Sequence, residues 1–75
     1  MKVYVLTKIL YKFDPFESYE VPIGVYLTQG SLIKAIAELE GDSYDQRTLS
    51  KEMRNYIPSD TNSYVYRWTD TPLTI

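Results

Sequence analysis

The chain lacks both cysteine and histidine, and each absence removes a class of chemistry. Without cysteine, the 75 residues form neither a disulfide framework nor a thiolate zinc site, so packing alone has to hold the fold together. Without histidine, the usual general base at neutral pH is missing, and cysteine, the strongest nucleophile, is missing with it. These absences predict a protein that is not an enzyme and needs no cofactor.

Basic residues are also few, with eight Lys and Arg against ten Asp and Glu, and the formal net charge is -2. Broad binding to a phosphate backbone needs clustered Lys and Arg, so this balance argues against nucleic acid and favours a protein partner with a basic or neutral surface. Lys8 interrupts the N-terminal apolar run, so we expect this run to be neither a signal peptide nor a membrane span. We therefore expect a soluble, cytoplasmic protein.

The three glycines form no phosphate-binding loop, because Gly24, Gly30 and Gly41 are too far apart. One Ser-x-x-Lys pattern is present at Ser31 and Lys34, but it lies at a helix start and lacks the partner motifs of the enzymes that use it. We interpret it as structural.

Carboxylates are more numerous, and four of them lie close together at Glu38, Glu40, Asp42 and Asp45. Their spacing is not that of a calcium loop, so we expect no metal site. The cluster is either a solvated acidic rim or a source of charge that steers the chain toward a basic protein surface.

What is present is typical of one small globular domain over residues 1–75, with 44% apolar and 24% charged residues. A chain of this length buries only about 60% of the surface that it exposes when unfolded, so its core is thin. Eight tyrosines are unusual in such a chain. Tyrosine packs as a hydrophobe and keeps a hydroxyl group, which suits half-buried faces and binding surfaces alike.

Alternating β-branched and aromatic residues predict a strand over 2–11 and a second over 19–27, joined by a turn over 14–18 that contains Asp14 and Pro15. Pro22 cannot donate a ladder hydrogen bond, so the second strand has to be either an edge strand or bulged at that residue.

Helical spacing of apolar residues predicts a main helix over 29–40, capped by Thr28 or Ser31 and ended by Gly41 in a left-handed conformation. A short second helix is predicted over 47–57, because Leu49, Met53 and Tyr56 would share one face. A polar loop then leads to a third strand over 63–69, and Pro72 argues against a central strand in the tail over 70–75.

The fold class predicted from this order is α+β, with a three-stranded, mainly antiparallel sheet and one main helix plus a short second helix on one face, in the order β-β-α-α-β. If Val21, Ile23, Val25 and Leu27 meet the main helix, tyrosines would line the other face of the sheet. The strand register does not follow from the sequence.

The most distinctive motif is "SYVYRWTD", which places Tyr64, Tyr66 and Trp68 on one side of the third strand and Arg67 on the other. Three interpretations remain open. The rings are part of the core, they are exposed and bind a partner protein or a second copy, or they stack nucleic-acid bases.

Two stretches, "MKVYVL" and "IGVYLTQGSLIKAIAELEG", resemble the hairpin and first helix of small uncharacterised bacterial and phage proteins. The second half, "SYDQRTLSKEMRNYIPSD", departs from that pattern, and the resemblance supplies no catalytic residue. The short, acidic profile without Cys or His is similar to that of phage-encoded inhibitors of bacterial defence, anti-CRISPR proteins among them. For such a protein the location would be the host cytoplasm.

Together these features predict a non-enzymatic protein-binding module that occupies a surface of a larger bacterial protein or complex, such as a defence system, as a phage inhibitor or regulator would. Its alternatives are a structural homodimer and a weak binder of single-stranded nucleic acid. The expected anchors are Tyr64, Tyr66, Arg67 and Trp68, and the expected steering charges are Glu38, Glu40, Asp42 and Asp45.

Overall fold

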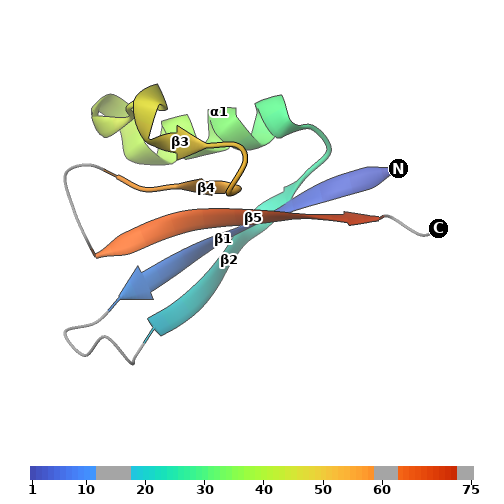
Figure 1. The fold of residues 1–75 in the computed structure, drawn as a ribbon, viewed down its shortest axis with the longest axis horizontal. Coiled ribbons are helices and arrows are strands. Elements are labelled where there is room, and N and C mark those ends of the chain that lie inside the picture. The colour runs from blue at the N-terminus through green and yellow to red at the C-terminus, as the bar shows by residue number, and fades with distance from the viewer. Residues whose placement is uncertain (12–17, 59–62, 73–75) are drawn as a thin grey trace.

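The computed structural model describes residues 1–11, 18–58 and 63–72, and it confirms an α+β protein with one main helix. The predicted count of three strands is wrong, because the strands form a single antiparallel sheet of five strands in the order β2-β1-β5-β4-β3, with α1 packed on one face (Figure 1). The elements are β1 Lys2–Tyr11, β2 Ser18–Tyr26, α1 Gln29–Glu40, the one-turn 3₁₀ helices η1 Gly41–Ser43 and η2 Gln46–Thr48, β3 Leu49–Ser50, β4 Asn55–Tyr56 and β5 Tyr64–Pro72.

Two sequence-based predictions concern segments that the structure leaves largely undescribed. The predicted turn over 14–18 lies outside the described residues except for Ser18, which begins β2, and the same holds for most of the predicted loop over 58–63. The long antiparallel pairing of β1 with β2, from Tyr4 opposite Tyr26 to Tyr11 opposite Ser18, shows that the chain reverses between them.

Helix α1 begins and ends where its capping residues predict. The Thr28 side chain accepts a hydrogen bond from the Ser31 backbone N–H at 3.1 Å, which satisfies one of the free donors of the first turn. At the other end Gly41 has φ 60° and ψ -129°, a conformation that only glycine adopts without strain, and its N–H donates to the Ala37 carbonyl.

Substituting the two helix glycines by alanine is therefore expected to have opposite effects. Gly41→Ala forces a Cβ into a positive-φ conformation and should lower the free energy of unfolding by about 1 to 2 kcal/mol. Gly30→Ala, in the first turn with open space around it, should raise it by about 0.5 to 1 kcal/mol. Urea unfolding at pH 7 measures both, and equal changes for the two variants would contradict the assignment of Gly41 as the cap.

Strand β2 has both of the features that Pro22 predicted as alternatives. It is an edge strand of the sheet, and its register against β1 shifts next to this residue, where Leu6 pairs with Gly24 but Thr7 pairs with Pro22. The extra residue, Ile23, is therefore a β-bulge. The bulge breaks the alternation along β2, so Ile23 and Tyr26 both pack toward the helix side while Val25 lies opposite Val5 on the other side.

The predicted second helix over 47–57 is wrong. In its place η2 leads into the β3–β4 hairpin, in which Leu49 pairs with Tyr56 across a turn that ends at Arg54 with φ 56°. The helical spacing of apolar residues misled the prediction, because Met53 lies exposed in that turn. The hairpin buries Tyr56 completely against Tyr66 of β5, which a surface helix with the same apolar stripe would not do.

The third predicted strand is longer and more central than expected, since β5 lies in the middle of the sheet and runs to Pro72. Asp70, Thr71 and Pro72 pair with β1 rather than forming a tail. Pro72 is tolerated because β4 pairs only with Tyr66 and Arg67, so no strand of the described residues lies beside the far side of β5 at Pro72.

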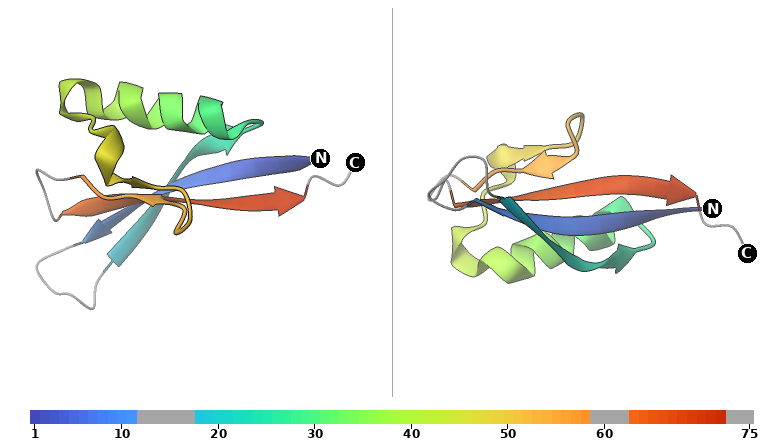
Figure 2. Two further views of the ribbon diagram at one scale, coloured as in Figure 1. Left: turned by 45° about the horizontal axis from the view of Figure 1, so that its top comes forward. Right: turned by 90° about the horizontal axis from the view of Figure 1, so that it is seen from below.

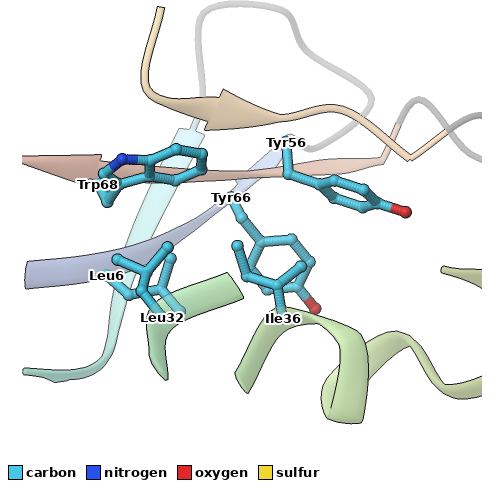
Figure 3. Close-up of a cluster of buried hydrophobic side chains, with 6 residues drawn as sticks. All are labelled: Leu6, Leu32, Ile36, Tyr56, Tyr66 and Trp68. Atoms are coloured by element: carbon cyan, nitrogen blue, oxygen red, sulfur yellow. The ribbon is translucent and has the colours of Figure 1, made fainter. Parts of the chain in front are cut away.

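The core lies between α1 and one face of the sheet. Leu32 and Ile36 of α1 point at Leu6 of β1 and at the aromatic rings of β4 and β5 (Figure 3). Six side chains form this buried cluster: Leu6, Leu32, Ile36, Tyr56, Tyr66 and Trp68. The expected placement of tyrosines on the uncovered side of the sheet is thereby overturned, because Tyr4, Tyr26 and Tyr64 also pack against this cluster.

Candidate protein-binding surface

Two of the expected aromatic anchors lie inside the protein. Tyr66 is 2% and Trp68 is 1% exposed, and both face α1 (Figure 3). The first of the three interpretations of the aromatic row is therefore confirmed for Tyr66 and Trp68, because both rings lie in the core. Neither ring offers a surface to a partner protein in this fold, and neither forms a platform on which nucleic-acid bases could stack.

Tyr64 closes one end of the core and makes several polar contacts. Its hydroxyl donates to Glu40 Oε2 at 2.8 Å, and its ring meets Tyr66 edge-on with 5.6 Å between centroids. Lys8 Nζ lies 4.1 Å from the Tyr64 ring centroid, a cation–π contact. Burial, and then the nearby Glu40 carboxylate, raise the pKa of Tyr66 above its ordinary value.

The four expected steering carboxylates do not act as one group. Glu40 is half-buried and holds Tyr64, whereas Asp45 accepts from the Arg47 backbone N–H at 3.0 Å and pairs with the Arg47 guanidinium at 3.2 Å. That hydrogen bonding from Arg47 lowers the pKa of Asp45. Of the four, only Glu38 and Asp42 are exposed. A steering role for these two stays a prediction.

Arg67, the fourth expected anchor, is exposed on the opposite side of the sheet from the rings. We call that side the open face, and it consists of Val3, Val5, Thr7 and Ile9 of β1, Glu20, Pro22 and Val25 of β2, and Val65, Arg67, Thr69 and Thr71 of β5. On the two flanking strands all of these side chains except Val65 are exposed. A hollow of about 210 Å³ lies across β1, lined by Val5, Thr7, Ile9, Glu20, Arg67 and Thr69.

A second exposed region is the hairpin of β1 and β2. The end of this hairpin formed by Tyr11 and Ser18 extends away from α1 in two different views (Figures 1 and 2). Five of the nine exposed large apolar side chains in the described part of the chain lie on it or directly after it. We call these residues together the hairpin surface: Tyr19 and Val21 on the helix side of the sheet, Tyr11 and Val25 on the side of the open face, and Leu27 directly after β2.

The backbone of β2 is also available along its outer edge. The Tyr11 N–H donates to the Ser63 carbonyl, so alternation turns the polar groups of Leu10 and Lys8 toward β2. Leu10 and Lys8 pair with Tyr19 and Val21 of β2. Glu20 lies between these two residues and therefore directs its N–H and C=O groups outward, away from β1. Pro22 interrupts this outer row, because it has no N–H to donate.

The described residues give no sign of a metal site or of a membrane-spanning helix. They contain no group of three or more metal-ligating side chains that could hold a metal ion. Among these same residues, no helix is long and apolar enough to cross a membrane.

Comparison with known proteins does not add to this description. No family model matches the chain, and neither a curated protein nor a solved structure matches it. The resemblance to phage proteins and the profile shared with anti-CRISPR proteins therefore stay hypotheses.

The hairpin surface was not predicted from the sequence, although a signal for it was present. Pro22 indicated an edge strand, and Tyr19, Val21, Val25 and Leu27 surround this residue. An edge strand with apolar residues on both sides has more apolar surface than one covering helix can bury. The sequence pointed to Tyr64, Tyr66 and Trp68 as anchors instead, because alternating rings give the same pattern whether they are buried or exposed.

Proposed function

We propose that this protein is a non-enzymatic protein-binding module that contacts its partner through the hairpin surface. The observation that supports this most directly is the concentration of exposed apolar side chains on β2, the long edge strand, where the outward backbone groups also lie. Exposed apolar side chains next to an open strand edge are typical of sites at which another polypeptide docks.

The contact would combine two kinds of interaction. Side chains such as Tyr19 and Val21 supply apolar area, and the outer backbone groups of β2 on either side of Pro22 supply hydrogen bonds to an extended segment of the partner. Pro22 divides that edge into two short stretches, which disfavours unlimited edge-to-edge assembly while leaving room for a specific contact.

The finer hypothesis is that the partner is a larger bacterial protein or complex, such as a defence system, which a phage inhibitor would occupy. The acidic balance of the chain and the exposed charges of Glu38 and Asp42 support a partner with a basic surface. Such a partner would associate faster at low ionic strength than at high ionic strength.

The test compares two double variants of the full chain. Tyr19→Thr with Val21→Thr removes apolar area from the hairpin surface and keeps residues that favour strands. Leu39→Gln with Met53→Gln removes exposed apolar area elsewhere and serves as the matched control. Each protein is immobilised and used to capture binding proteins from a bacterial host lysate, after circular dichroism has established that it is folded.

We expect the hairpin variant to bind the captured protein at least about tenfold more weakly than the wild type, because exposed aromatic and aliphatic residues dominate such contacts. The control variant should bind as the wild type does. Equal capture by the two variants would contradict the proposed role of the hairpin surface, and so would the absence of any captured protein with the wild-type chain.

A further inference from the structure

The open face carries two opposite charges on either side of its central strand. Glu20 of β2 lies opposite Ile9 of β1, and Arg67 of β5 lies opposite Thr7. Both side chains line the hollow that crosses β1. None of the ion pairs between described residues involves Glu20 or Arg67.

Between and around these charges the surface is made of small β-branched residues. Val5, Thr7 and Ile9 of β1 form the floor, and Thr69 of β5 forms part of the rim. Such residues bury well against another sheet, since two sheets pack face to face about 10 Å apart with their side chains interdigitated. The open face thus has an apolar centre and a charged rim, the pattern of protein interfaces.

We propose that the open face binds the open face of a second copy of this chain, giving a two-fold symmetric dimer. A two-fold interface brings the same patch together from both copies, so the patch has to be complementary to itself. With the axis running along β1, the β2 strand of each copy faces the β5 strand of the other. Glu20 of each copy then meets Arg67 of the other, and two equivalent ion pairs form.

The charges also select this orientation over its alternative. A two-fold axis perpendicular to β1 and parallel to the sheet would make β2 face β2 and β5 face β5. The Glu20 side chains of the two copies would then face each other, and so would the Arg67 side chains. Like charges in such positions repel. The offset between Glu20 and Arg67 along β1 is two residues, about 6 to 7 Å, which these two long side chains can span together.

The size of the face sets the strength that can be expected. Three strands about 4.8 Å apart, with nine residues at about 3.3 Å each, cover roughly 430 Å² on each copy. That is less than the roughly 800 Å² per partner of a standard stable interface, so the dimer is weak. The open face shares Val25 with the hairpin surface, but Tyr19 and Val21, which are changed in the test of the proposed function, lie on the other side of the sheet, so the two tests are separate.

The test is sedimentation equilibrium of the purified full chain between about 10 µM and about 1 mM, the range in which a weak interface assembles. Four variants are compared with the wild type: Glu20→Arg, Arg67→Glu, the double variant that exchanges both charges, and Lys34→Glu as a control on the exposed side of α1. Circular dichroism melting establishes that each variant is folded.

We expect the wild type to dimerise, and each single charge reversal to weaken the dimer at least about tenfold. The double exchange should restore dimerisation, because each Arg again faces a Glu, and Lys34→Glu should leave it unchanged. Raising the salt concentration should weaken the wild-type dimer and the double variant alike.

Three results would overturn the proposal. One is a wild-type chain that stays monomeric to about 1 mM, as it would if a different protein occupies this face. The second is a dimer that neither single charge reversal weakens. The third is a folded double variant that dimerises no better than the single variants. Loss of dimerisation in the Tyr19→Thr with Val21→Thr variant is not expected, which separates this test from that of the proposed function.

Discussion

Replacing Trp68 by alanine is expected to lower the free energy of unfolding by about 3 to 5 kcal/mol. Trp68 is one of the largest fully buried side chains in the described residues, and it packs in one cluster with Leu6 and Leu32. A chain of 75 residues has a total stability of only about 4 to 11 kcal/mol. The variant should therefore be largely unfolded or close to unfolding at 37 °C.

Urea unfolding followed by circular dichroism measures this loss, since the only tryptophan is removed. Two variants serve as controls. Trp68→Phe keeps most of the ring volume and removes a buried Nε1 donor that has no acceptor among the described residues, so it should lose less than half as much stability. Leu27→Ala removes a side chain that is 67% exposed and should change stability by less than about 0.5 kcal/mol.

This prediction separates the two roles considered for the aromatic row. If Trp68 were an exposed anchor, its truncation would reduce partner binding and leave the unfolding midpoint where it is. A Trp68→Ala protein that unfolds cooperatively at the wild-type urea concentration would contradict its place in the core.

Raising the pH above about 10 is expected to destabilise the protein by about 1.4 kcal/mol for each pH unit through Tyr66 alone. Burial is the main reason that the pKa of Tyr66 is raised, and the Glu40 carboxylate adds to it. The unfolded chain loses this proton near pH 10, whereas the folded protein keeps it. The contribution of the protonated Tyr66 to the free energy of unfolding is therefore fully present below pH 10, and it is lost as the pH rises toward the pKa of Tyr66 in the folded protein.

Tyr66→Phe is the variant that isolates this effect, because it removes the hydroxyl and keeps the ring. Between about pH 10 and pH 12 its stability should fall by about 2 to 3 kcal/mol less than that of the wild type. Some alkaline loss should remain in the variant, since burial, with smaller contributions from Tyr56 and Asp45, also raises the pKa of Tyr44. Urea unfolding at several pH values provides the measurement, and identical pH dependence in the two proteins would show that Tyr66 is not the responsible group.

Local interactions made part of this fold predictable. Helix α1 could be located because its cap at Thr28 and its end at Gly41 depend on side chains and dihedral angles within a few residues. One missing N–H group at Pro22 predicted either an edge position or a bulge, and the structure has both. Each of these features has a physical cause that is contained in the segment itself.

The β3–β4 hairpin shows where such local inference fails. Residues 47–57 carry apolar side chains at helical spacing, but the segment folds as a hairpin because Tyr56 gains complete burial beside Tyr66, a residue outside the segment. The gain from burying a large ring exceeds a local preference of a few tenths of a kcal/mol per residue.

By itself, the sequence determined the α+β class, the main helix with its end at Gly41, and the absence of thiol and imidazole chemistry, and it left open whether β2 is an edge strand or bulged at Pro22. Only the tertiary structure decided which side of each strand meets the helix, and with it that Tyr66 and Trp68 are buried while Glu20 and Arg67 are exposed together on the other face. The physical reason is the period of two along a strand. Alternation separates the side chains into two sets, but the choice of the buried set depends on strand pairing across the whole sheet, where one bulge at Ile23 changes the outcome.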